Sequence, residues 1–219
     1  MSVLPLHSAA DAAACAPAVA AHLAGGGVVA YPTETVYGLG TGLQPAALGR
    51  LAQMKGRESD KPFLLLAVEP AGLPGLHWTP AATLLAARFW PGPLSLALAA
   101  DASYPAPVRS ASGTVAVRDT PHPALRALLQ RVAGPLTSTS ANLPGLMPAT
   151  TLAGLLTVLV GLRGGQDVLV LDGGALPASP PSTVVDCSGE RPRLLRAGAV
   201  PLAELRAVLQ EGGFVIDVG

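Results

Sequence analysis

Four short polar segments stand out from an otherwise apolar sequence, and they hold the residue types best suited to chemistry. The segment KGRESDKP, residues 55–62, contains Lys55, Arg57 and Lys61, of which the first and last are the only lysines in the chain. A lysine supplies a compact positive charge and an arginine a rigid fork of donors, so the combination suits a polyphosphate. A solvated surface turn is the simpler interpretation of a charged loop and stays open.

The second segment, LTSTSAN at residues 136–142, places four hydroxyl groups and an amide in six consecutive positions. Such neutral groups can bind phosphate or carboxylate oxygens without the desolvation cost of burying more charge. If the segment is a strand, Ser138 and Ser140 point to one face and Thr137 and Thr139 to the other. The alternative is a turn whose hydroxyl groups bond their own backbone.

The other two segments are PTETVYGLG at residues 32–40 and PSTVVD at residues 181–186. Glu34 is a weak candidate for a general base or a metal ligand, because no second carboxylate lies at a helpful spacing. Arg118, at the end of the strand-like TVAVR, fits either a structural ion pair or bidentate binding of a substrate carboxylate. His122 lies between two prolines and fits a turn or a helix start better than a catalyst.

The elements that must position these segments alternate along the chain. Apolar, β-rich runs predict strands at 28–31, 63–68, 94–98, 114–117, 168–171 and 183–185. Helical patterns lie between them at 45–54, 80–89, 123–132, 152–162 and 202–209, and three of these open on proline. A further helix is predicted over 17–24, with Pro17 near its start. This alternation implies an α/β domain with a mostly buried sheet, whose strand ends would gather the polar segments around one crevice.

Composition restricts the class of protein. The 219 residues suffice for a sizeable core, and we expect a single domain over residues 1–219. Half of the residues are hydrophobic and 13% are charged, which is typical of a compact globular chain. Fourteen basic and fourteen acidic residues balance, so no global field favours nucleic acid or an anionic membrane.

Cysteine use and apolar runs indicate the compartment. Cys15 and Cys187 form no CxxC or Cys/His cluster, which disfavours a disulfide framework or a structural zinc and fits reduced thiols. The first basic residue is Arg50, so the basic region of a signal peptide is missing, and no unbroken apolar stretch is long enough to span a bilayer. We therefore expect a cytoplasmic protein with no membrane segment. Common phosphate and hydrolase motifs, such as GxxxxGK[ST], GxGxxG, HExxH and GxSxG, are also missing.

Six ordered motifs resemble those of the YrdC-like family, and within it the L-threonylcarbamoyladenylate synthases. They are GGGVVAYPTETVYGLG, KGRESDKPF, GTVAVRDTPHP, STSAN, PSTVVD and LLRAGAV, and the resemblance covers about residues 17–210. It implies one domain in which a twisted open mixed sheet with flanking helices surrounds a concave cavity. It also implies a nucleotidyltransferase that makes threonylcarbamoyl-AMP and pyrophosphate from L-threonine, bicarbonate or CO2, and ATP. A separate transfer complex would then pass the threonylcarbamoyl group to an adenosine of tRNA.

The resemblance assigns roles to individual residues. The family signature, Lys-x-Arg with Ser-x-Asn, would surround the ATP phosphates as the catalytic group, and here it is Lys55, Arg57, Ser140 and Asn142. Arg196 and Lys61 would lie on the nucleotide side. The positions that match threonine-binding residues are Thr33, Arg118, Thr139 and Ser182. The hydroxyl-rich segment could hold both substrates only if its strand ends there and the chain turns. Mg²⁺ would arrive with ATP, and we expect neither a protein-held metal nor a tightly bound organic cofactor.

Two features depart from the family pattern, and two other functions stay open. Pro144 stands before Gly145 where the family commonly continues SANxSG, and Phe63 replaces the usual leucine. The chain ends near Gly219 and so resembles the short, single-domain form. One alternative is a non-catalytic module that binds structured RNA, such as tRNA or double-stranded RNA; the other is a carbamoyl-adenylate-forming domain. A threonine requirement would separate the synthase from the latter, and activity without RNA would separate both enzymes from the former.

Overall fold

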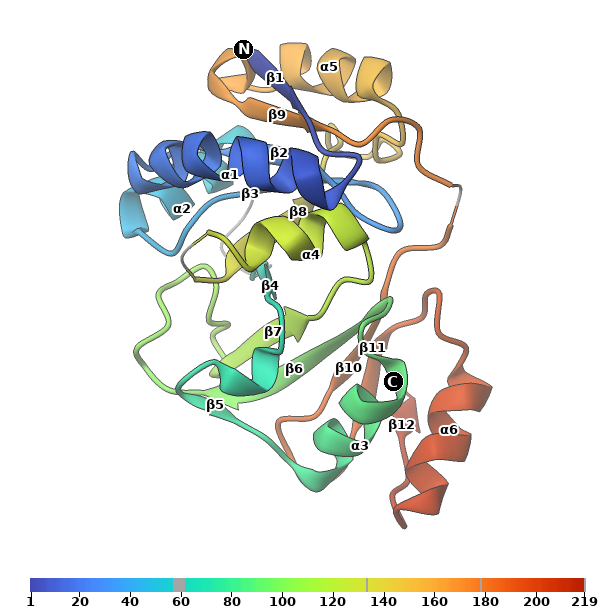
Figure 1. The fold of residues 1–219 in the computed structure, drawn as a ribbon. Coiled ribbons are helices and arrows are strands. Elements are labelled where there is room, and N and C mark those ends of the chain that lie inside the picture. The colour runs from blue at the N-terminus through green and yellow to red at the C-terminus, as the bar shows by residue number, and fades with distance from the viewer. Residues whose placement is uncertain (57–61, 133, 178, 219) are drawn as a thin grey trace.

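The computed structural model describes residues 1–56, 62–132, 134–177 and 179–218, and these form one open mixed sheet flanked by helices (Figure 1). The helices are α1 (Ala9–Ala24), α2 (Pro45–Met54), α3 (Pro80–Phe89), α4 (Pro123–Leu129), α5 (Leu152–Gly161) and α6 (Leu202–Glu211), with short 3-10 turns η1 (Pro70–Gly72) and η2 (Gly165–Asp167). The strands are β1 (Ser2–Pro5), β2 (Val29–Pro32), β3 (Tyr37–Gly40), β4 (Leu64–Leu66), β5 (Leu76–His77), β6 (Leu94–Ala100), β7 (Thr114–Arg118), β8 (Leu136–Ser140), β9 (Leu169–Asp172), β10 (Thr183–Asp186), β11 (Arg193–Arg196) and β12 (Asp217–Val218).

The sheet consists of two halves that meet at β8. Its strand order is β1-β9-β2-β3-β8-β4-β7-β6-β10-β11-β12, with β5 paired to β6. Parallel pairs such as β2 with β9 and β4 with β7 stand beside antiparallel pairs such as β3 with β8. In Figure 1, β2 and β9 run across the view and β10 and β11 run down it, so the sheet is strongly twisted. The predicted α/β class with an open mixed sheet is confirmed.

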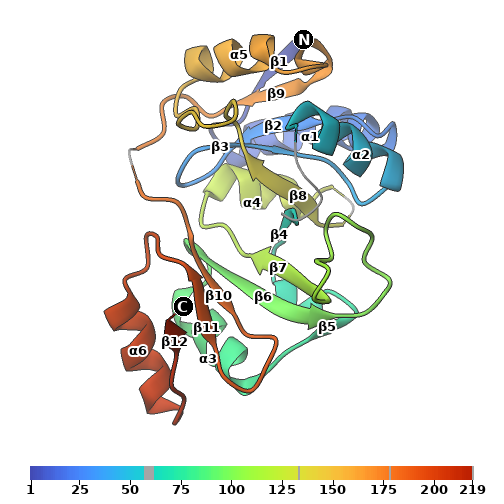
Figure 2. The ribbon, with the colours of Figure 1, turned by 180° about the vertical axis from the view of Figure 1, so that it is seen from behind.

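Helices cover both faces of the first half of the sheet. In Figure 1, α1 lies in front of β2, whereas α2 lies in front of the sheet when the molecule is seen from behind in Figure 2. Side chains alternate accordingly: Val29 and Tyr31 belong to the core under α1 and α4, and Val28 and Ala30 to the core under α2 and α5. Burial on both faces explains why this strand reads as a continuous apolar run.

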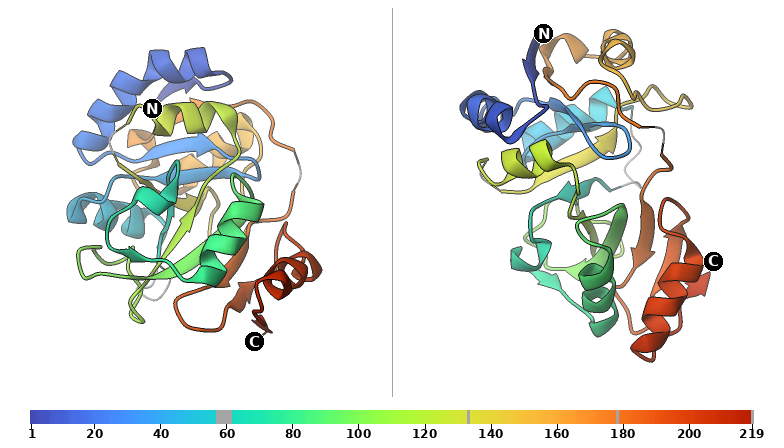
Figure 3. Two further views of the ribbon diagram at one scale, coloured as in Figure 1. Left: turned by 60° about the horizontal axis from the view of Figure 1, so that its bottom comes forward. Right: turned by 45° about the vertical axis from the view of Figure 1, so that its right-hand side comes forward.

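The second half of the sheet has helices on the face that carries its large apolar side chains. Leu94, Leu96 and Leu98 of β6 point into the same core as α3 and α6, while Ser95 and Ala97 take the alternate positions. Figure 3 shows α3 and α6 together at this end of the molecule, away from α1. The small and polar positions of β6, β7 and β10 therefore lie on the opposite face, which is where the candidate site forms.

Helix α1 begins earlier than the sequence pattern suggested. We expected Pro17 near a helix start, but it lies inside α1, which begins at Ala9. The start is set by a capping box in which Ser8 and Asp11 bond each other's backbone N–H groups, and the alanine-rich segment that follows favours a helix. The prediction was wrong because it gave a proline more weight than a cap.

Two strands of the first half were not predicted, and one of them depends on glycine. β1 lies before the first predicted element, and β3 has the sequence YGLG, which local preference does not favour as a strand. A Cβ atom at Gly40 would lie 1.8 Å from the carbonyl oxygen of Thr137, and one at Gly38 would lie 2.9 Å from the ring of Tyr31. These glycines are needed because neighbouring groups approach the backbone too closely for any side chain.

The remaining helices agree well with expectation. α2 and α3 have the predicted bounds, Thr79 and Thr151 cap α3 and α5, and α4 ends at Leu129, before the predicted Val132. The two tryptophans flank α3: the rings of Trp78 and Trp90 meet edge to face with centroids 5.8 Å apart.

Two further expectations concern the state of the cysteines and membrane-spanning helices. Cys15 and Cys187 are both buried and free. Across the part of the chain that the structure describes, no helix combines the length and apolar character that crossing a bilayer requires.

Candidate functional site

Lys55, Ser140 and Asn142, three residues of the predicted nucleotide group, come together at the end of β8. Lys55 caps the C-terminus of α2, and its ammonium group donates to the carbonyl oxygens of Ser140 (2.9 Å) and Asn142 (2.6 Å) and to Oδ1 of Asn142 (3.0 Å). An ammonium group has three protons, and these three acceptors converge on it. The lysine thus ties α2 to the turn that follows β8 and places a positive charge beside that turn.

The Asn142 side chain organises the rest of this turn. Its Oδ1 also accepts from the Ser140 hydroxyl (2.7 Å), and its Nδ2 donates to the carbonyl oxygens of Leu143 (2.9 Å) and Leu146 (3.1 Å). The Leu143–Leu146 segment, where the sequence departs from the family pattern, is therefore held by the signature asparagine itself. Arg57 and Lys61, the other predicted nucleotide-side cations of this region, lie outside the described residues, and their roles stay predictions.

Strand β8 continues through Ser140 before the chain turns. It pairs Thr139 with Leu39 and Ser140 with Gly38 of β3, and the turn begins with the N–H of Ala141 donating to Tyr37. Consecutive strand residues point to opposite faces, so Thr139 and Ser140 do not share a face of β8. Thr137, on the face of Thr139, is buried and bonds the backbone of Thr41. The predicted contact of Thr139 with threonine stays a prediction.

A second group of predicted residues meets at the end of β7. Arg118 is 4% exposed and its Nη1 lies 3.3 Å from Oε1 of Glu34, which comes from the loop between β2 and β3. The hydroxyl group of Thr120 donates to the other oxygen, Oε2, at 2.8 Å. The arginine is therefore both a buried ion-pair partner and a group at a strand end, so the two interpretations left open for it are not exclusive.

Thr33 shapes the loop that carries Glu34. Its hydroxyl group donates to the carbonyl oxygen of Val36 at 2.7 Å and accepts from the N–H groups of Thr35 and Val36, each at 3.2 Å. These bonds form a tight turn of the kind that threonine favours. In this structure the hydroxyl of Thr33 serves the loop, and its predicted binding of threonine stays untested.

Ser182 and Arg196, predicted on different substrate sides, are in direct contact. The guanidinium of Arg196 donates to the carbonyl oxygen of Ser182 from Nε (3.1 Å) and Nη2 (2.8 Å), and to its hydroxyl at 3.0 Å. Ser182 also contacts the hydroxyl of Ser95 in β6 at 3.1 Å. Burial, together with the neighbouring positive charge of Arg118, lowers the pKa of Arg196. The positive charge of Arg118 thus acts on Arg196, and an anion bound near either guanidinium would be favoured.

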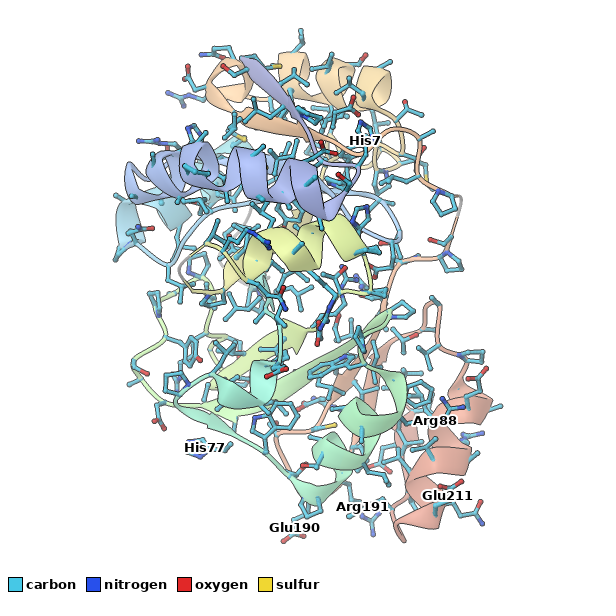
Figure 4. The ribbon with its side chains drawn as sticks, viewed as in Figure 1. His7, His77, Arg88, Glu190, Arg191 and Glu211 are labelled. Carbon is cyan, nitrogen blue, oxygen red and sulfur yellow. The ribbon has the colours of Figure 1, made fainter. Side chains whose placement is uncertain are left out.

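His122 forms a helix cap, as its position between prolines indicated. Its Nδ1 accepts from the N–H of Leu125 at 3.2 Å at the start of α4. Burial lowers the pKa of His122, and the nearby carboxylate of Glu34 opposes this shift. The other histidines lie elsewhere: Figure 4 shows His7 and His77 far apart at the outside of the molecule, and His77 contacts Asp101 at 2.7 Å.

One hairpin connects the two groups of residues. The β2–β3 loop carries Glu34 to Arg118, and β3 pairs with β8 beside Ser140. The connection from β9 to β10 also reaches this hairpin, because the Ser179 hydroxyl donates to the carbonyl oxygen of Glu34 at 3.3 Å and the phenol of Tyr37 donates to that of Gly174 at 2.8 Å. The candidate site thus contains residues from both halves of the sheet.

Sequence reasoning missed three contributors to the site and undervalued Glu34. Thr120 lies three residues beyond the end of the strand predicted at 114–117, and Ser95 is a lone hydroxyl in an apolar strand. These positions were the only available signals. Ser179 lies in a loop with no motif.

Two expectations for this site concern a bound metal and a central cavity. Within the described ranges, no group of three or more His, Cys, Asp or Glu residues could hold a metal ion. Cavities of about 400 and 370 Å³ lie beside Arg50 and Arg163 and beside Glu69 and Leu73, respectively. The central concave cavity implied by the resemblance stays a prediction.

Comparison with known proteins identifies relatives of this chain. The Sua5/YciO/YrdC family, described as "Telomere recombination", matches residues 21–198. A threonylcarbamoyl-AMP synthase of Pyrococcus abyssi is 34% identical over 189 residues, 85% of this chain and 54% of that protein. One of Thiobacillus denitrificans is 38% identical over 173 residues, 78% of this chain and 89% of that protein. The crystal structure of P. abyssi Sua5 complexed with L-threonine superposes with a TM-score of 0.85 at 30% identity, covering 100% of this chain and 63% of that one. The chain thus spans about half the length of the first of these relatives.

Proposed function

The chain belongs to the Sua5/YciO/YrdC family, and from this premise we propose that it is an L-threonylcarbamoyladenylate synthase. The enzyme would be a nucleotidyltransferase that converts L-threonine, bicarbonate or CO2, and ATP into threonylcarbamoyl-AMP and pyrophosphate. The names of the curated relatives and the threonine-bound Sua5 structure support this proposal. A cytoplasmic location and a downstream complex that transfers the product to tRNA belong to the same proposal.

The observation that carries the proposal is the convergence of two polar groups on one hairpin. Lys55 reaches Ser140 and Asn142 on one side. On the other, Arg118 pairs with Glu34 of the β2–β3 loop, and its charge lowers the pKa of Arg196. The reaction requires two anionic substrates, a carboxylate and a triphosphate, to be held next to each other. Guanidinium and ammonium groups at adjacent positions are suited to that task.

The chemistry requires positioning more than covalent catalysis. The amine of threonine would add to CO2 with loss of a proton, and an oxygen of the resulting carbamate would attack the α-phosphorus of ATP and displace pyrophosphate. Arg118 and Arg196 would hold the carboxylate and neutralise nearby phosphate charge, while Ser140 and Asn142 would fix the nucleotide at the end of β8. Mg²⁺ would enter as part of the MgATP substrate and share in neutralising the phosphates.

Pyrophosphate release tests the proposal directly. Purified protein would be assayed with MgATP and bicarbonate, with or without L-threonine and without RNA. We expect release that depends on threonine, and a decrease of about 10²- to 10³-fold in Asn142→Ala, which loses a preorganised amide. Arg88→Ala is the matched control, because Arg88 lies on α3 at the outside of the molecule (Figure 4).

Two outcomes would contradict the proposal. Folded protein that releases no pyrophosphate under any of these conditions is not a self-sufficient synthase, and binding of double-stranded RNA by that protein would support the RNA-binding alternative. Release that depends on carbamoyl phosphate in place of threonine and bicarbonate would support the carbamoyl-adenylate alternative.

A further inference from the structure

We propose that Glu34 binds the amino group of the amino-acid substrate while Arg118 beside it binds the carboxylate. The inference rests on the proposed function, since it assumes that the substrate is an α-amino acid. It adds a residue that the family signature and the predicted threonine contacts leave out. Glu34 would contact the nitrogen that forms the new bond to carbon, so it would be a catalytic residue.

The first argument is the arrangement of charge. An α-amino acid carries an ammonium and a carboxylate group on a single carbon atom, so its binding site needs a negative and a positive group close together. Oε1 of Glu34 lies 3.3 Å from Nη1 of Arg118, and both side chains are largely buried, at 16% and 5% exposure. Low exposure strengthens the interaction of each charge with a bound ion of opposite sign.

The second argument is unused hydrogen-bonding capacity. Oε1 of Glu34 and Nε of Arg118 are both buried, and neither has a hydrogen-bond partner among the residues that the structure describes. Buried polar atoms are nearly always satisfied in native proteins, and leaving one without a partner is costly. A bound α-amino acid would supply both missing partners, an N–H donor for Oε1 and a carboxylate oxygen for Nε.

The third argument is that the carboxylate of Glu34 is held in a fixed orientation. Thr120, which is fully buried, donates to Oε2, and Thr33 and Ser179 fix the backbone of the loop. With Oε2 occupied, Oε1 has the ion pair with Nη1 of Arg118 but no hydrogen-bond donor, and so retains capacity for an N–H group of a ligand. A preorganised acceptor of this kind costs little to use when substrate binds.

The charge balance around Glu34 also fits an amino acid. Arg118 faces the Glu34 carboxylate, its positive charge also lowers the pKa of the neighbouring Arg196, and Nδ1 of His122 accepts a backbone N–H and so carries no proton. Asp119 is paired with Arg126 and accepts the N–H of Glu69, so its charge is already balanced. The group therefore carries one excess positive charge, which the substrate carboxylate would balance.

A comparison of two ligands tests the inference. Binding of L-threonine and of its α-hydroxy analogue, 2,3-dihydroxybutanoate with the matching configuration, would be measured by calorimetry on the wild-type chain and on Glu34→Gln. We expect Glu34→Gln to weaken threonine binding about ten- to a hundredfold, and to change binding of the hydroxy acid less than about threefold. The hydroxy acid lacks the ammonium group, so it should not sense the lost charge. Arg88→Ala is the control.

The outcomes separate this inference from the function on which it rests. If Glu34→Gln weakens both ligands equally, Glu34 only positions Arg118, and the inference fails while the proposed function stands. Threonine binding by Glu34→Gln within about threefold of wild type also overturns it. If folded wild-type protein binds no threonine, with or without ATP, both fail. Should Glu34→Gln not fold, Glu34→Asp retracts the charge by one methylene and must show the same selective loss.

Discussion

At the scale of single residues, Lys55 shows how a predicted substrate ligand can also be a structural element. Its ammonium group links the C-terminus of α2 to three oxygen atoms of the turn after β8. Those oxygen atoms belong to Ser140 and Asn142, which the family signature places at the nucleotide. The lysine therefore contributes to the shape of the predicted nucleotide site without any bound phosphate.

Replacing Lys55 should accordingly affect both stability and activity. In Lys55→Met the side chain is one atom shorter and loses its charge, which leaves the converging oxygen atoms without their shared donor. We expect the free energy of unfolding to fall by about 1–3 kcal/mol and pyrophosphate release to fall about 10²-fold or more. Urea unfolding and the release assay measure the two effects. Unchanged stability would show that the turn holds its shape without the lysine.

The residue scale also shows what a sequence can reveal about a site. Lys55, Ser140 and Asn142 could be found because each lies in a short motif. Glu34 is in a motif as well, but its role depends on Arg118, which is distant in sequence and comes close only through the pairing of β2, β3, β8, β4 and β7. Local spacing carries no information about that pairing, so the sequence showed only that no second carboxylate lies at a helpful spacing from Glu34.

At the scale of elements, β3 is the part of the site that local preference predicts least. Its two glycines allow the Tyr31 ring and the backbone of Thr137 to approach closely. Helices such as α2 and α3 were predicted with their bounds because proline and apolar spacing mark them locally. β3 could not be predicted in the same way, because its glycines are required by the Tyr31 ring and the Thr137 backbone, which only the folded sheet brings beside them.

A pair of glycine substitutions tests whether a glycine is required because neighbouring atoms leave no space for a Cβ atom. Gly40→Ala would place a Cβ atom 1.8 Å from the Thr137 carbonyl oxygen, whereas Gly49→Ala, inside α2, would meet no atom within 4 Å. We expect Gly40→Ala to destabilise the fold by about 3 kcal/mol or more. Gly49→Ala should stabilise it by about 0.5–1 kcal/mol, because alanine favours a helix. Thermal unfolding measures both, and equal effects of the two changes would contradict the geometry.

At the scale of the whole molecule, the site depends on how two halves of one sheet are joined. The two halves share β8, and the connection from β9 to β10 crosses between them beside Glu34. The α/β class followed from the alternation of elements, but the strand order did not, since neither the register nor the partner of a strand is encoded in its own residues. The folded core also buries ionisable groups that the mechanism does not use.

Those buried groups predict how stability depends on pH. Burial raises the pKa of the Cys187 thiol from 9.0 to about 12 and raises that of the Tyr31 phenol, so both stay protonated in the folded chain under mildly alkaline conditions. The unfolded chain releases these protons at lower pH, so stability is complete below about pH 9 and decreases as the pH rises toward 12. Each group contributes a loss of about 1.4 kcal/mol per pH unit above its unfolded pKa, which is about 9 for the thiol and about 10 for the phenol, until its folded pKa is reached.

Chemical unfolding at a series of pH values measures this loss. The free energy of unfolding should be similar at pH 7 and 8 and lower at pH 10, and Cys187→Ala should show a shallower decrease because it removes one of the buried acids whose pKa is raised. A free energy that stays level from pH 8 to 10 would contradict the assignment of these groups as buried and protonated.

The edge-to-face pair of Trp78 and Trp90 has a practical consequence. These are the chain's only tryptophans, and both stand at the ends of α3 in the second half of the sheet. Fluorescence excited selectively at tryptophan will therefore report the loosening of that half alone, while far-ultraviolet circular dichroism follows helices in both. Denaturation curves that coincide by the two signals would identify the chain as one cooperative unit, and curves that separate would reveal which half loses its structure first.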